Sequence, residues 1–283
     1  MKIIKATFLG MCFGVRDAIQ LALQQTEPLT ILGDLVHNET VMGELRARGI
    51  RVDHRVAAVE TARVMITAHG ASQATLNRLQ ERGREILQAT CPLVHFAHRA
   101  VASLVARGFH PVVIGQRNHV EVRGLTEDLA ECDVILTPEE VLELRERPRF
   151  GVAAQTTQPI DKVRSLVALL RDRFPGSEVR FVDTVCQPTK QRQNAAVEVA
   201  KQCDVVIVIG GANSNNTREL VGTCGQFCRQ VHHVQTADDL RAEWFSDART
   251  VGITAGTSTP DSLIDAVEKR LATWKAIASE KAA

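Results

Sequence analysis

The sequence predicts an α/β protein made of three similar units, each with a small parallel sheet, arranged around a pseudo-threefold axis. Three observations support this prediction. A strand–cysteine–helix pattern occurs three times along the 283 residues. Apolar runs such as VVIVI (205–209) show no alternation with polar residues, which is typical of parallel strands covered by helices on both faces. Polar loops recur after the strands, where sheets of this kind bind ligands.

The repeated pattern places a cysteine between a short apolar strand and an amphipathic helix. The three segments read ATFLGMCFGVRDAIQLALQQ, QATCPLVHFAHRA and VRFVDTVCQPTKQRQNAAVEVAKQ. Their cysteines are Cys12, Cys91 and Cys186, which are 79 and 95 residues apart. Pro92 directly follows Cys91, and proline is favoured in the first turn of a helix, so Cys91 is predicted to be the N-cap of its helix.

Two further strands, each ending in a polar loop, follow each cysteine helix. The first loops lie in LTILGDLVHNETVMGEL, HPVVIGQRNHVEVRGL and DVVIVIGGANSNNTREL, and the second in RVMITAHGASQATLNRL, RFGVAAQTTQPIDKVRSLV and RTVGITAGTSTPDSLIDAV. We therefore predict α/β units over residues 12–90, 91–185 and 186–274. The N-terminal strand within residues 1–11 is expected to pack with the third or the first unit, and the polar tail, 275–283, to be frayed.

Composition favours an ordinary globular protein. Charged residues make up 24% of the chain and the net charge is +1, so no strong field attracts nucleic acid or an acidic membrane surface. Aromatic residues make up 4%, without tyrosine, which argues against a surface for base stacking. No apolar run approaches the roughly 20 residues of a membrane span, and the N-terminus lacks the features of a signal peptide. We expect a cytoplasmic protein that binds neither nucleic acid nor membranes.

The three repeated cysteines are candidate ligands of one metal centre. A helix N-terminus favours the thiolate form that binds metal, and three sheets packed around an axis can bring three strand-end loops together. Three thiolates without a histidine at fixed spacing suit an iron–sulfur cluster better than zinc. A [4Fe–4S] cluster held by three cysteines leaves one iron open to a substrate. The alternative is that these thiols only pack in the core. We expect packing for the other four cysteines, Cys132, Cys203, Cys224 and Cys228.

Two of the polar loops suit an anion. GGANSNNT (210–217) lacks the lysine of a Walker loop, but its glycines, amides and hydroxyls precede a helix, whose N-terminus attracts phosphate. TAGTSTPD (254–261) places Ser258 in the same setting, and His37 and His69 follow strands and can neutralise an anion. Together the loops predict a diphosphate site. The alternatives are ordinary helix caps and surface histidines.

A carboxyl lies in the segment RNHVEVRG (117–124), which holds His119 and Glu121. A carboxyl beside an open iron can donate a proton to a leaving hydroxyl, provided that burial raises its pKa. Thr156 and Thr157 lie on the second loop of the same unit and can orient that proton. The alternative is a solvated glutamate.

Taken together, these segments resemble the 4-hydroxy-3-methylbut-2-enyl diphosphate reductases, the IspH/LytB family. The resemblance spans nearly the whole chain and includes, in the family's order, VHNETVMGELRARGI, TAHGAS, ATCPLVH, QTT, DTVCQPTKQRQ and GGANSNNT. It implies three α/β domains around a central [4Fe–4S] cluster held by Cys12, Cys91 and Cys186. It also implies the reductive dehydroxylation of (E)-4-hydroxy-3-methylbut-2-enyl diphosphate to isopentenyl and dimethylallyl diphosphates, the last step of the non-mevalonate isoprenoid pathway. Electrons would come from ferredoxin or flavodoxin, with NADPH upstream.

The resemblance further implies roles for single residues. Glu121 is the proton donor and Thr156 its helper. The residues expected around the substrate are His37, His69, His119, Ser214, Asn215, Asn216 and Ser258. Three positions depart from the family's usual pattern: Phe13 replaces alanine, Val120 replaces proline, and Asn215 replaces serine. These departures leave open a paralogue that acts on a different oxygenated substrate.

Two other function classes are open at this stage. One is a dehydratase that uses its cluster as a Lewis acid, as in quinolinate synthase, and the other is a redox sensor or binding protein that holds a cluster. The Glu121 and Thr156 loops favour reduction, because Lewis-acid dehydration needs no electron path. A sensor needs neither a tuned proton donor nor a phosphate loop, so Glu121 and GGANSNNT argue against it.

Overall fold

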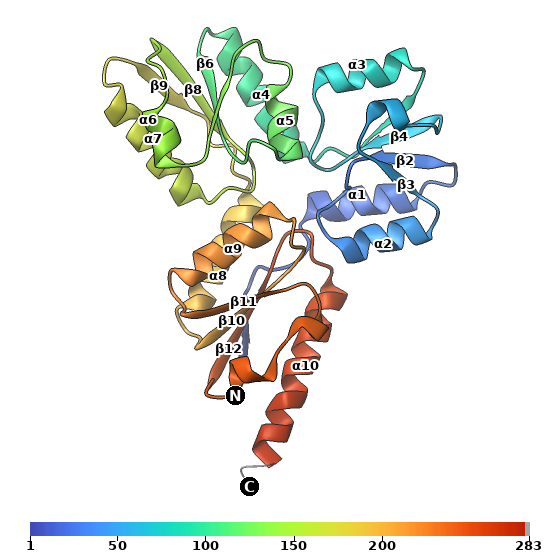
Figure 1. The fold of residues 1–283 in the computed structure, drawn as a ribbon, viewed down its shortest axis with the longest axis vertical. Coiled ribbons are helices and arrows are strands. Elements are labelled where there is room, and N and C mark those ends of the chain that lie inside the picture. Colours follow the sequence, from blue (N-terminus) through green and yellow to red (C-terminus); the bar gives the residue numbers. More distant parts are fainter. Residues whose placement is uncertain (281–283) are drawn as a thin grey trace. The chain divides into compact units, whose positions relative to one another are not determined.

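The computed structural model describes residues 1–280 and shows an α/β fold (Figure 1). Strands and helices alternate along most of the described chain, and its twelve strands form three four-stranded sheets. Every pair of neighbouring strands in these sheets is parallel. The predicted α/β class with three parallel sheets is therefore confirmed, whereas the arrangement around a pseudo-threefold axis stays a prediction.

The first sheet has the strand order β3-β2-β4-β5. Its strands are β2 (Leu29–Leu32), β3 (Arg51–Asp53), β4 (Arg63–Ile66) and β5 (Glu85–Gln88). The helices in this part of the chain are α1 (Phe13–Leu23), α2 (Glu39–Ala47), α3 (Gln73–Glu81) and the short 3₁₀ helix Val56–Ala58. Val64 and Ile66 of β4 are buried against Leu79 of α3, which joins the helix to the sheet.

The second sheet repeats this order as β7-β6-β8-β9. Its strands are β6 (His110–Ile114), β7 (Asp133–Ile135), β8 (Arg149–Ala154) and β9 (Glu178–Phe181). The helices in this part of the chain are α4 (Pro92–Ala106), α5 (Val120–Thr126), α6 (Pro138–Leu142) and α7 (Ile160–Arg173). Phe150 of β8 is fully buried and stacks on Phe174, which follows α7.

The third sheet has the order β1-β12-β10-β11, so it combines the N-terminal strand with the last third of the chain. Its strands are β1 (Lys2–Lys5), β10 (Val205–Ile209), β11 (Gln230–Val234) and β12 (Thr250–Ala255). The helices are α8 (Gln187–Ala200), α9 (Asn215–Gly225), α10 (Asp261–Glu280) and the 3₁₀ helices Ala237–Asp239 and Ala242–Phe245. All five residues of β10 are buried, as expected for a central parallel strand, and each such side chain contributes about 1.5–3 kcal/mol by leaving water.

The three sheets share one order, in which β1 occupies the edge position that β5 and β9 occupy in the other two. Each repeated cysteine follows the strand in this edge position, and a helix begins directly after it. The pairs of edge strand and cysteine are β1 with Cys12, β5 with Cys91, and β9 with Cys186. The three cysteines therefore have equivalent places in three equivalent sheets.

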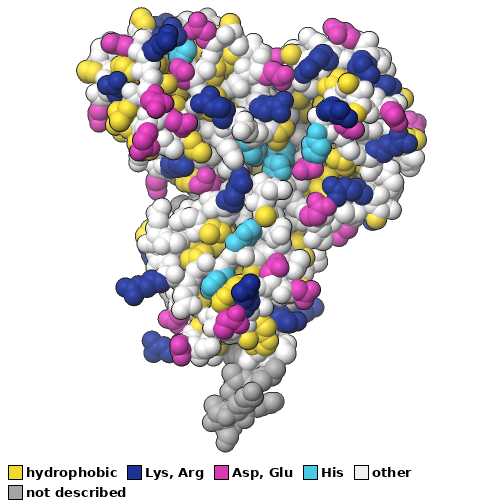
Figure 2. Space-filling view, in the orientation of Figure 1, with side chains coloured by type: hydrophobic (Ala, Val, Ile, Leu, Met, Phe, Trp, Pro, Cys, Tyr) yellow, Lys and Arg dark blue, Asp and Glu magenta, His cyan; other side chains and the backbone are white. Residues whose placement is uncertain are grey.

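The chain divides into two compact units. The two-sheet unit comprises Gly14–Val36 and Met42–Cys186 and holds the first and second sheets. The single-sheet unit comprises Met1–Phe13, His37–Val41 and the chain from Gln187 onward, and holds the third sheet. The predicted domain boundaries at residues 90/91 and 185/186 stay predictions. Acidic and basic side chains are interspersed on the visible face of both units (Figure 2), in keeping with the net charge of +1.

Two further expectations concern membranes and the C-terminal tail. Within residues 1–280, no helix combines the length and the apolar composition that a membrane crossing requires. Helix α10 continues through residues 275–280 of the tail that we expected to be frayed. The rest of that tail, 281–283, lies outside the described residues.

Candidate active site

Each repeated cysteine lies directly before a helix. Cys91 is the N-cap of α4, with φ −58° and ψ 134°, and Pro92 is the first helical residue, as predicted. Its side chain makes no capping hydrogen bond to the helix. Cys12 directly precedes α1 and Cys186 directly precedes α8. The first turn of a helix is the positive end of its dipole, which interacts favourably with negative charge placed there.

The same backbone hydrogen bond holds all three cysteines. In each sheet the cysteine N–H donates to a carbonyl in the loop that follows the neighbouring strand. The pairs are Cys12 with Thr257 at 3.2 Å, Cys91 with Ala68 at 3.1 Å, and Cys186 with Thr156 at 3.0 Å. These are the loops that carry Ser258, His69 and Thr156. Each predicted metal ligand is thus bonded to a loop with a predicted substrate or proton-transfer residue.

The absence of a side chain at Gly14 leaves room for the sulfur of Cys91. A Cβ added to Gly14 would lie 2.5 Å from Cys91 Sγ, so no other residue fits at position 14 without a shift. No disulfide joins the cysteines of the described chain. Thiols that form no disulfide and lie at helix starts, one of them in space that a side chain at position 14 would fill, are suited to bind a metal cluster.

Glu121 is a buried acid in the two-sheet unit. It lies in the first turn of α5 and is 1% exposed. Thr156 donates to both carboxylate oxygens, from its N–H to Oε1 at 2.7 Å and from its Oγ1 to Oε2 at 3.0 Å. Burial raises the pKa of Glu121 to about 7, and the two hydrogen bonds from Thr156 oppose this rise. The alternative of a solvated glutamate is therefore wrong, and the carboxyl suits a general acid near neutral pH.

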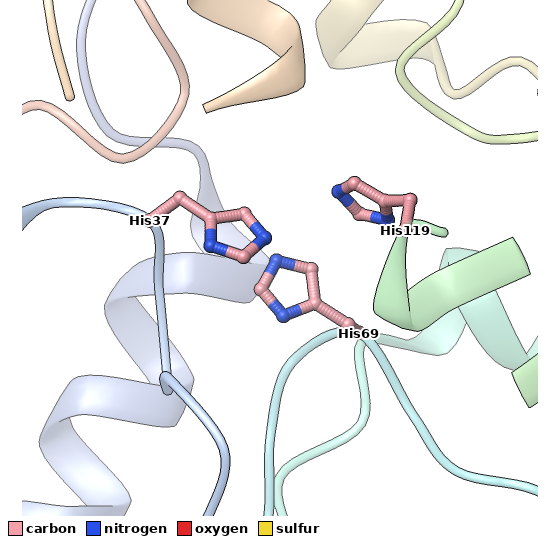
Figure 3. Close-up of side chains that lie close together, drawn as sticks. All are labelled: His37, His69 and His119. Atoms are coloured by element: carbon pink, nitrogen blue, oxygen red, sulfur yellow. The ribbon is translucent and has the colours of Figure 1, made fainter. Parts of the chain in front are cut away.

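His119 is bonded to this acid, and His69 contacts His119 in the same unit. His119 is the N-cap of α5, and its Nδ1 accepts from the N–H of Glu121 at 3.1 Å. The neutral ring therefore carries its proton on Nε2, which is a donor. The ring of His69 meets that of His119 edge to face, with centroids 5.5 Å apart (Figure 3). His37, also drawn there, belongs to the single-sheet unit.

The single-sheet unit carries the loops predicted to bind diphosphate. Ser214 is the N-cap of α9, where its Oγ accepts from the N–H of Thr217 at 3.3 Å, and such a hydroxyl can still donate its hydrogen. Oδ1 of Asn216 accepts from the N–H of Thr257 at 3.0 Å, which joins the loops after β10 and β12. Asn216 is 2% exposed, and its Nδ2 has no hydrogen-bond partner in the described chain. A buried donor of this kind is stabilised when an anion accepts from it.

The remaining predicted substrate residues lie in the same unit. Ser258 is buried, and its Oγ donates to the carbonyl oxygen of His37 at 3.3 Å. Gly211 lies directly against that carbonyl, where a Cβ would collide with it. Asn215 is the first residue of α9 and is buried. The His37 segment and the loops after β10 and β12 are therefore packed together.

Comparison with known proteins identifies the family. The family model of the LytB protein matches residues 3–272, which is nearly the whole chain. This chain belongs to the LytB family. Its LytB relatives include the 4-hydroxy-3-methylbut-2-enyl diphosphate reductase of Trichlorobacter lovleyi, 36% identical over 275 residues, which cover 96% of this chain and 98% of the relative. The reductase of the same name from Aquifex aeolicus is 34% identical over 277 residues, which cover 95% of each chain.

Two solved structures resemble this LytB chain over most of its length. One is the E-1-hydroxy-2-methyl-but-2-enyl-4-diphosphate reductase of Plasmodium falciparum, with a TM-score of 0.87 and 25% identity, covering 93% of this chain and 86% of that chain. The other is an (E)-4-hydroxy-3-methyl-but-2-enyl diphosphate reductase described as the terminal enzyme of the non-mevalonate pathway. Its TM-score is 0.68 at 32% identity, covering 96% of this chain and all of that chain. The three-sheet fold is thus the fold of LytB-family reductases.

Two residues of this LytB chain support the site although the sequence analysis did not single them out. Arg192 of α8 is buried, and its Nε and Nη2 donate to the carbonyl of Gly10 at 2.9 and 2.7 Å, which holds the turn before Cys12. Gln155 is fully buried, and its Oε1 accepts from the N–H of Gln116 at 3.1 Å, which ties the loop before His119 to β8. In the sequence Arg192 resembles a surface residue, because the helix around it is polar. Gln155 could have been recognised, because it begins the polar segment QTTQ directly after an apolar strand.

Of the four cysteines outside the repeated pattern, two are buried and two, Cys132 and Cys203, are half-buried against the core. Cys224 and Cys228 are 0% and 6% exposed and lie in the core around α8 and α9, as predicted. Burial raises the pKa of Cys224 to about 12, and burial together with Asp133 raises that of Cys132 to about 12. These two thiols stay protonated at neutral pH and are poor metal ligands.

Proposed function

We propose that this LytB chain reduces (E)-4-hydroxy-3-methylbut-2-enyl diphosphate to isopentenyl and dimethylallyl diphosphates. The observation that most supports this proposal is the buried Glu121 carboxyl, which two hydrogen bonds from Thr156 orient. The carbonyl of Thr156 in turn accepts from the N–H of Cys186, so the proposed proton donor and one proposed metal ligand are both bonded to Thr156. In the reaction the allylic C–O bond breaks, two electrons and two protons are consumed, and water leaves. One proton goes to the departing hydroxyl and the other to a carbon of the allyl group.

We assign Cys12, Cys91 and Cys186 as ligands of a [4Fe–4S] cluster. Their equivalent places, their matching backbone hydrogen bonds and the space that Gly14 leaves for the sulfur of Cys91 support this assignment. When bound, the cluster would supply electrons and an iron that acts as a Lewis acid toward the substrate hydroxyl.

Glu121 and Thr156 handle the proton. The pKa of about 7 allows Glu121 to be protonated before the C–O bond breaks and to release that proton as the hydroxyl leaves. The carboxylate that results keeps both hydrogen bonds from Thr156, which stabilise its charge in the buried site. Thr156 therefore orients Glu121 in both protonation states.

The diphosphate would bind to polar donors and to a helix N-terminus rather than to a cluster of lysines. The proposed substrate residues are His37, His69, His119, Ser214, Asn215, Asn216 and Ser258. The buried Nδ2 of Asn216 and the N-terminus of α9 are suited to phosphate oxygens. The Nε2–H of His119 supplies a further donor.

The electron donor would be a one-electron protein carrier, ferredoxin or flavodoxin, with NADPH as the upstream source. Two transfers complete one reduction. Reduced methyl viologen is also a one-electron reductant, so we use it as the electron source to test the chemistry without the protein donor.

An anaerobic assay tests the proposed function. The cluster-loaded protein should oxidise reduced methyl viologen only when the allylic diphosphate is added, and mass spectrometry should show the two C5 diphosphates. Changing Cys12, Cys91 or Cys186 to serine should lower bound iron and abolish turnover, whereas Cys132→Ala should retain both. Unchanged substrate in the presence of a fully loaded cluster would reject the function, and full iron in any one of the three serine variants would reject its ligand role.

A further inference from the structure

Two acidic residues at the end of α5 bind the beginning of α3. Asp128 accepts from the first two N–H groups of that helix, from Gln73 to Oδ2 at 2.6 Å and from Ala74 to Oδ1 at 2.9 Å. Glu127 accepts from the Oγ of Ser72, the N-cap of α3, at 2.6 Å. N–H groups in the first turn of a helix have no partner within the helix, and a carboxylate there also interacts favourably with the helix dipole. These short, charge-assisted bonds are therefore a strong link between the two helices.

The link joins a loop of the first sheet to a helix of the second. Ser72 lies three residues after His69 in the loop that follows β4, and α5 begins with His119 and Glu121. The contact between the rings of His69 and His119 thus lies at one end of this interface, and the carboxylate pair Glu127–Asp128 lies at the other. All these residues belong to the two-sheet unit.

The middle of the interface is closely packed. Gly124 of α5 lies against the backbone of Ala71, so that an added Cβ would stand 3.6 Å from its Cα. His98 of α4 lies next to both Gly70 and Gly124. Burial lowers the pKa of His98, which keeps this ring neutral. The loop after β4 therefore contacts both α4 and α5 between these two ends.

We propose that Asp128, together with Glu127, is a positioning residue that determines where His69 lies relative to His119 and Glu121. The carboxylate pair acts through α3 and the loop before it and makes no contact with substrate. The inference rests on the proposed function, because it concerns the placement of a residue assigned to substrate binding. A displacement of about 1 Å in a preorganised site can cost up to about 100-fold in rate.

Kinetics of three variants test this proposal. Asp128→Ala should raise the KM for the allylic diphosphate by about tenfold and change kcat by less than about threefold, because the Glu121–Thr156 pair stays intact. Asp128→Asn keeps one acceptor oxygen and should recover most of the affinity. Thr137→Ala is the matched control, because it removes the N-cap of a different helix, α6, in the same unit. In that cap the Oγ1 of Thr137 accepts from the N–H of Glu140 at 3.3 Å. An unchanged KM in the alanine variant, or an equal rise in the Thr137 control, would overturn the proposal.

Hydrogen–deuterium exchange of the cluster-loaded protein without substrate gives a second measurement. In Asp128→Ala the amides of residues 69–76 should exchange faster than in the unmodified chain, whereas those of α6 should not. Wild-type exchange at residues 69–76 would refute the link. If the unmodified chain fails to consume the allylic diphosphate, the proposed function fails, but the exchange comparison still decides whether Asp128 holds the His69 loop.

Discussion

Glu121 should control the pH dependence of turnover. Burial raises the pKa of this carboxyl from its ordinary value of 4.5 to about 7. At about 1.4 kcal/mol per pH unit, the rise corresponds to about 3 kcal/mol in favour of the protonated form. A general acid acts only when protonated, so kcat should be constant well below pH 7 and fall about tenfold for each pH unit above it.

Two substitutions assign this dependence to Glu121. Glu121→Gln keeps an acceptor for the N–H of Thr156 and gains a donor to its Oγ1, so the fold should persist while turnover falls about 10²–10⁴-fold and the alkaline decline disappears. Thr156→Val removes a hydrogen bond that lowers the pKa of Glu121, so the alkaline decline should move to higher pH. The shift distinguishes a role in proton transfer from general damage to the site.

The assay is kcat at saturating allylic diphosphate, measured anaerobically with reduced methyl viologen from about pH 5 to about pH 9. Iron content and the cluster absorbance at each pH serve as the control, because loss of the cluster would mimic a decline. A wild-type kcat that stays flat to the alkaline end would refute the role of Glu121. So would a Gln variant that keeps the wild-type decline.

The same pKa predicts a trend in stability. The folded carboxyl has a pKa of about 7 and the unfolded one about 4.5, so the unfolded chain loses its proton first as the pH rises. The contribution of Glu121 to stability is therefore greatest below about pH 4.5 and decreases by up to about 3 kcal/mol as the pH approaches 7. Glu121→Gln lacks this loss, so its melting temperature should rise relative to wild type across that interval. A difference that is independent of pH would contradict the burial argument.

The remaining predictions concern one metal ligand and one substrate residue. Gly14→Ala should displace the sulfur of Cys91 and lower the amount of iron bound per chain. Gly43→Ala is the control, because an added Cβ there meets nothing within 4 Å, and it should leave the iron content unchanged. Equal iron content in both variants would show that Gly14 is dispensable. Asn216→Asp retains the oxygen that accepts from Thr257 but replaces the buried donor with a negative charge, and should raise the KM for the diphosphate by about 100-fold. A KM within about threefold of wild type at an unchanged melting temperature would remove Asn216 from the diphosphate site.

Much of the fold could be predicted because its signals are local. The apolar run of β10, the cysteine at a helix start and the proline after Cys91 each depend on only a few neighbouring residues. The repetition of these patterns predicted three parallel sheets. It did not predict that each cysteine follows the edge strand of its sheet. It also left open whether the N-terminal strand joins the third or the first unit, whereas β1 pairs with β12 at the edge of the third sheet. Which strand occupies an edge depends on pairing between distant segments, which periodicity does not encode.

In the candidate site, too, local features could be predicted from the sequence and contacts between distant residues could not. Ser214 and His119 were recognised as loop residues before helices, and both are N-caps in the structure. The supporting contacts were not recognised, because they join residues far apart in the chain. Arg192 bonds Gly10 across 182 residues, and Asp128 bonds Gln73 across 55. Arg192 lies within the segment DTVCQPTKQRQ, but neither its periodicity nor that of Asp128 distinguishes the residue from an exposed charge.

The sequence by itself determined the repeated strand–cysteine–helix order, the parallel sheets and the residue types available for metal, proton and anion. Apolar runs, helix caps and turn residues act over a few positions, so they can be recognised without the fold. Only the tertiary structure decided that Glu121 is buried against Thr156, that Gly14 makes room for the sulfur of Cys91, and that Asp128 links α5 to the His69 loop. Burial, pKa and the placement of side chains depend on atoms brought together by long-range packing, and that packing exists only in the folded chain.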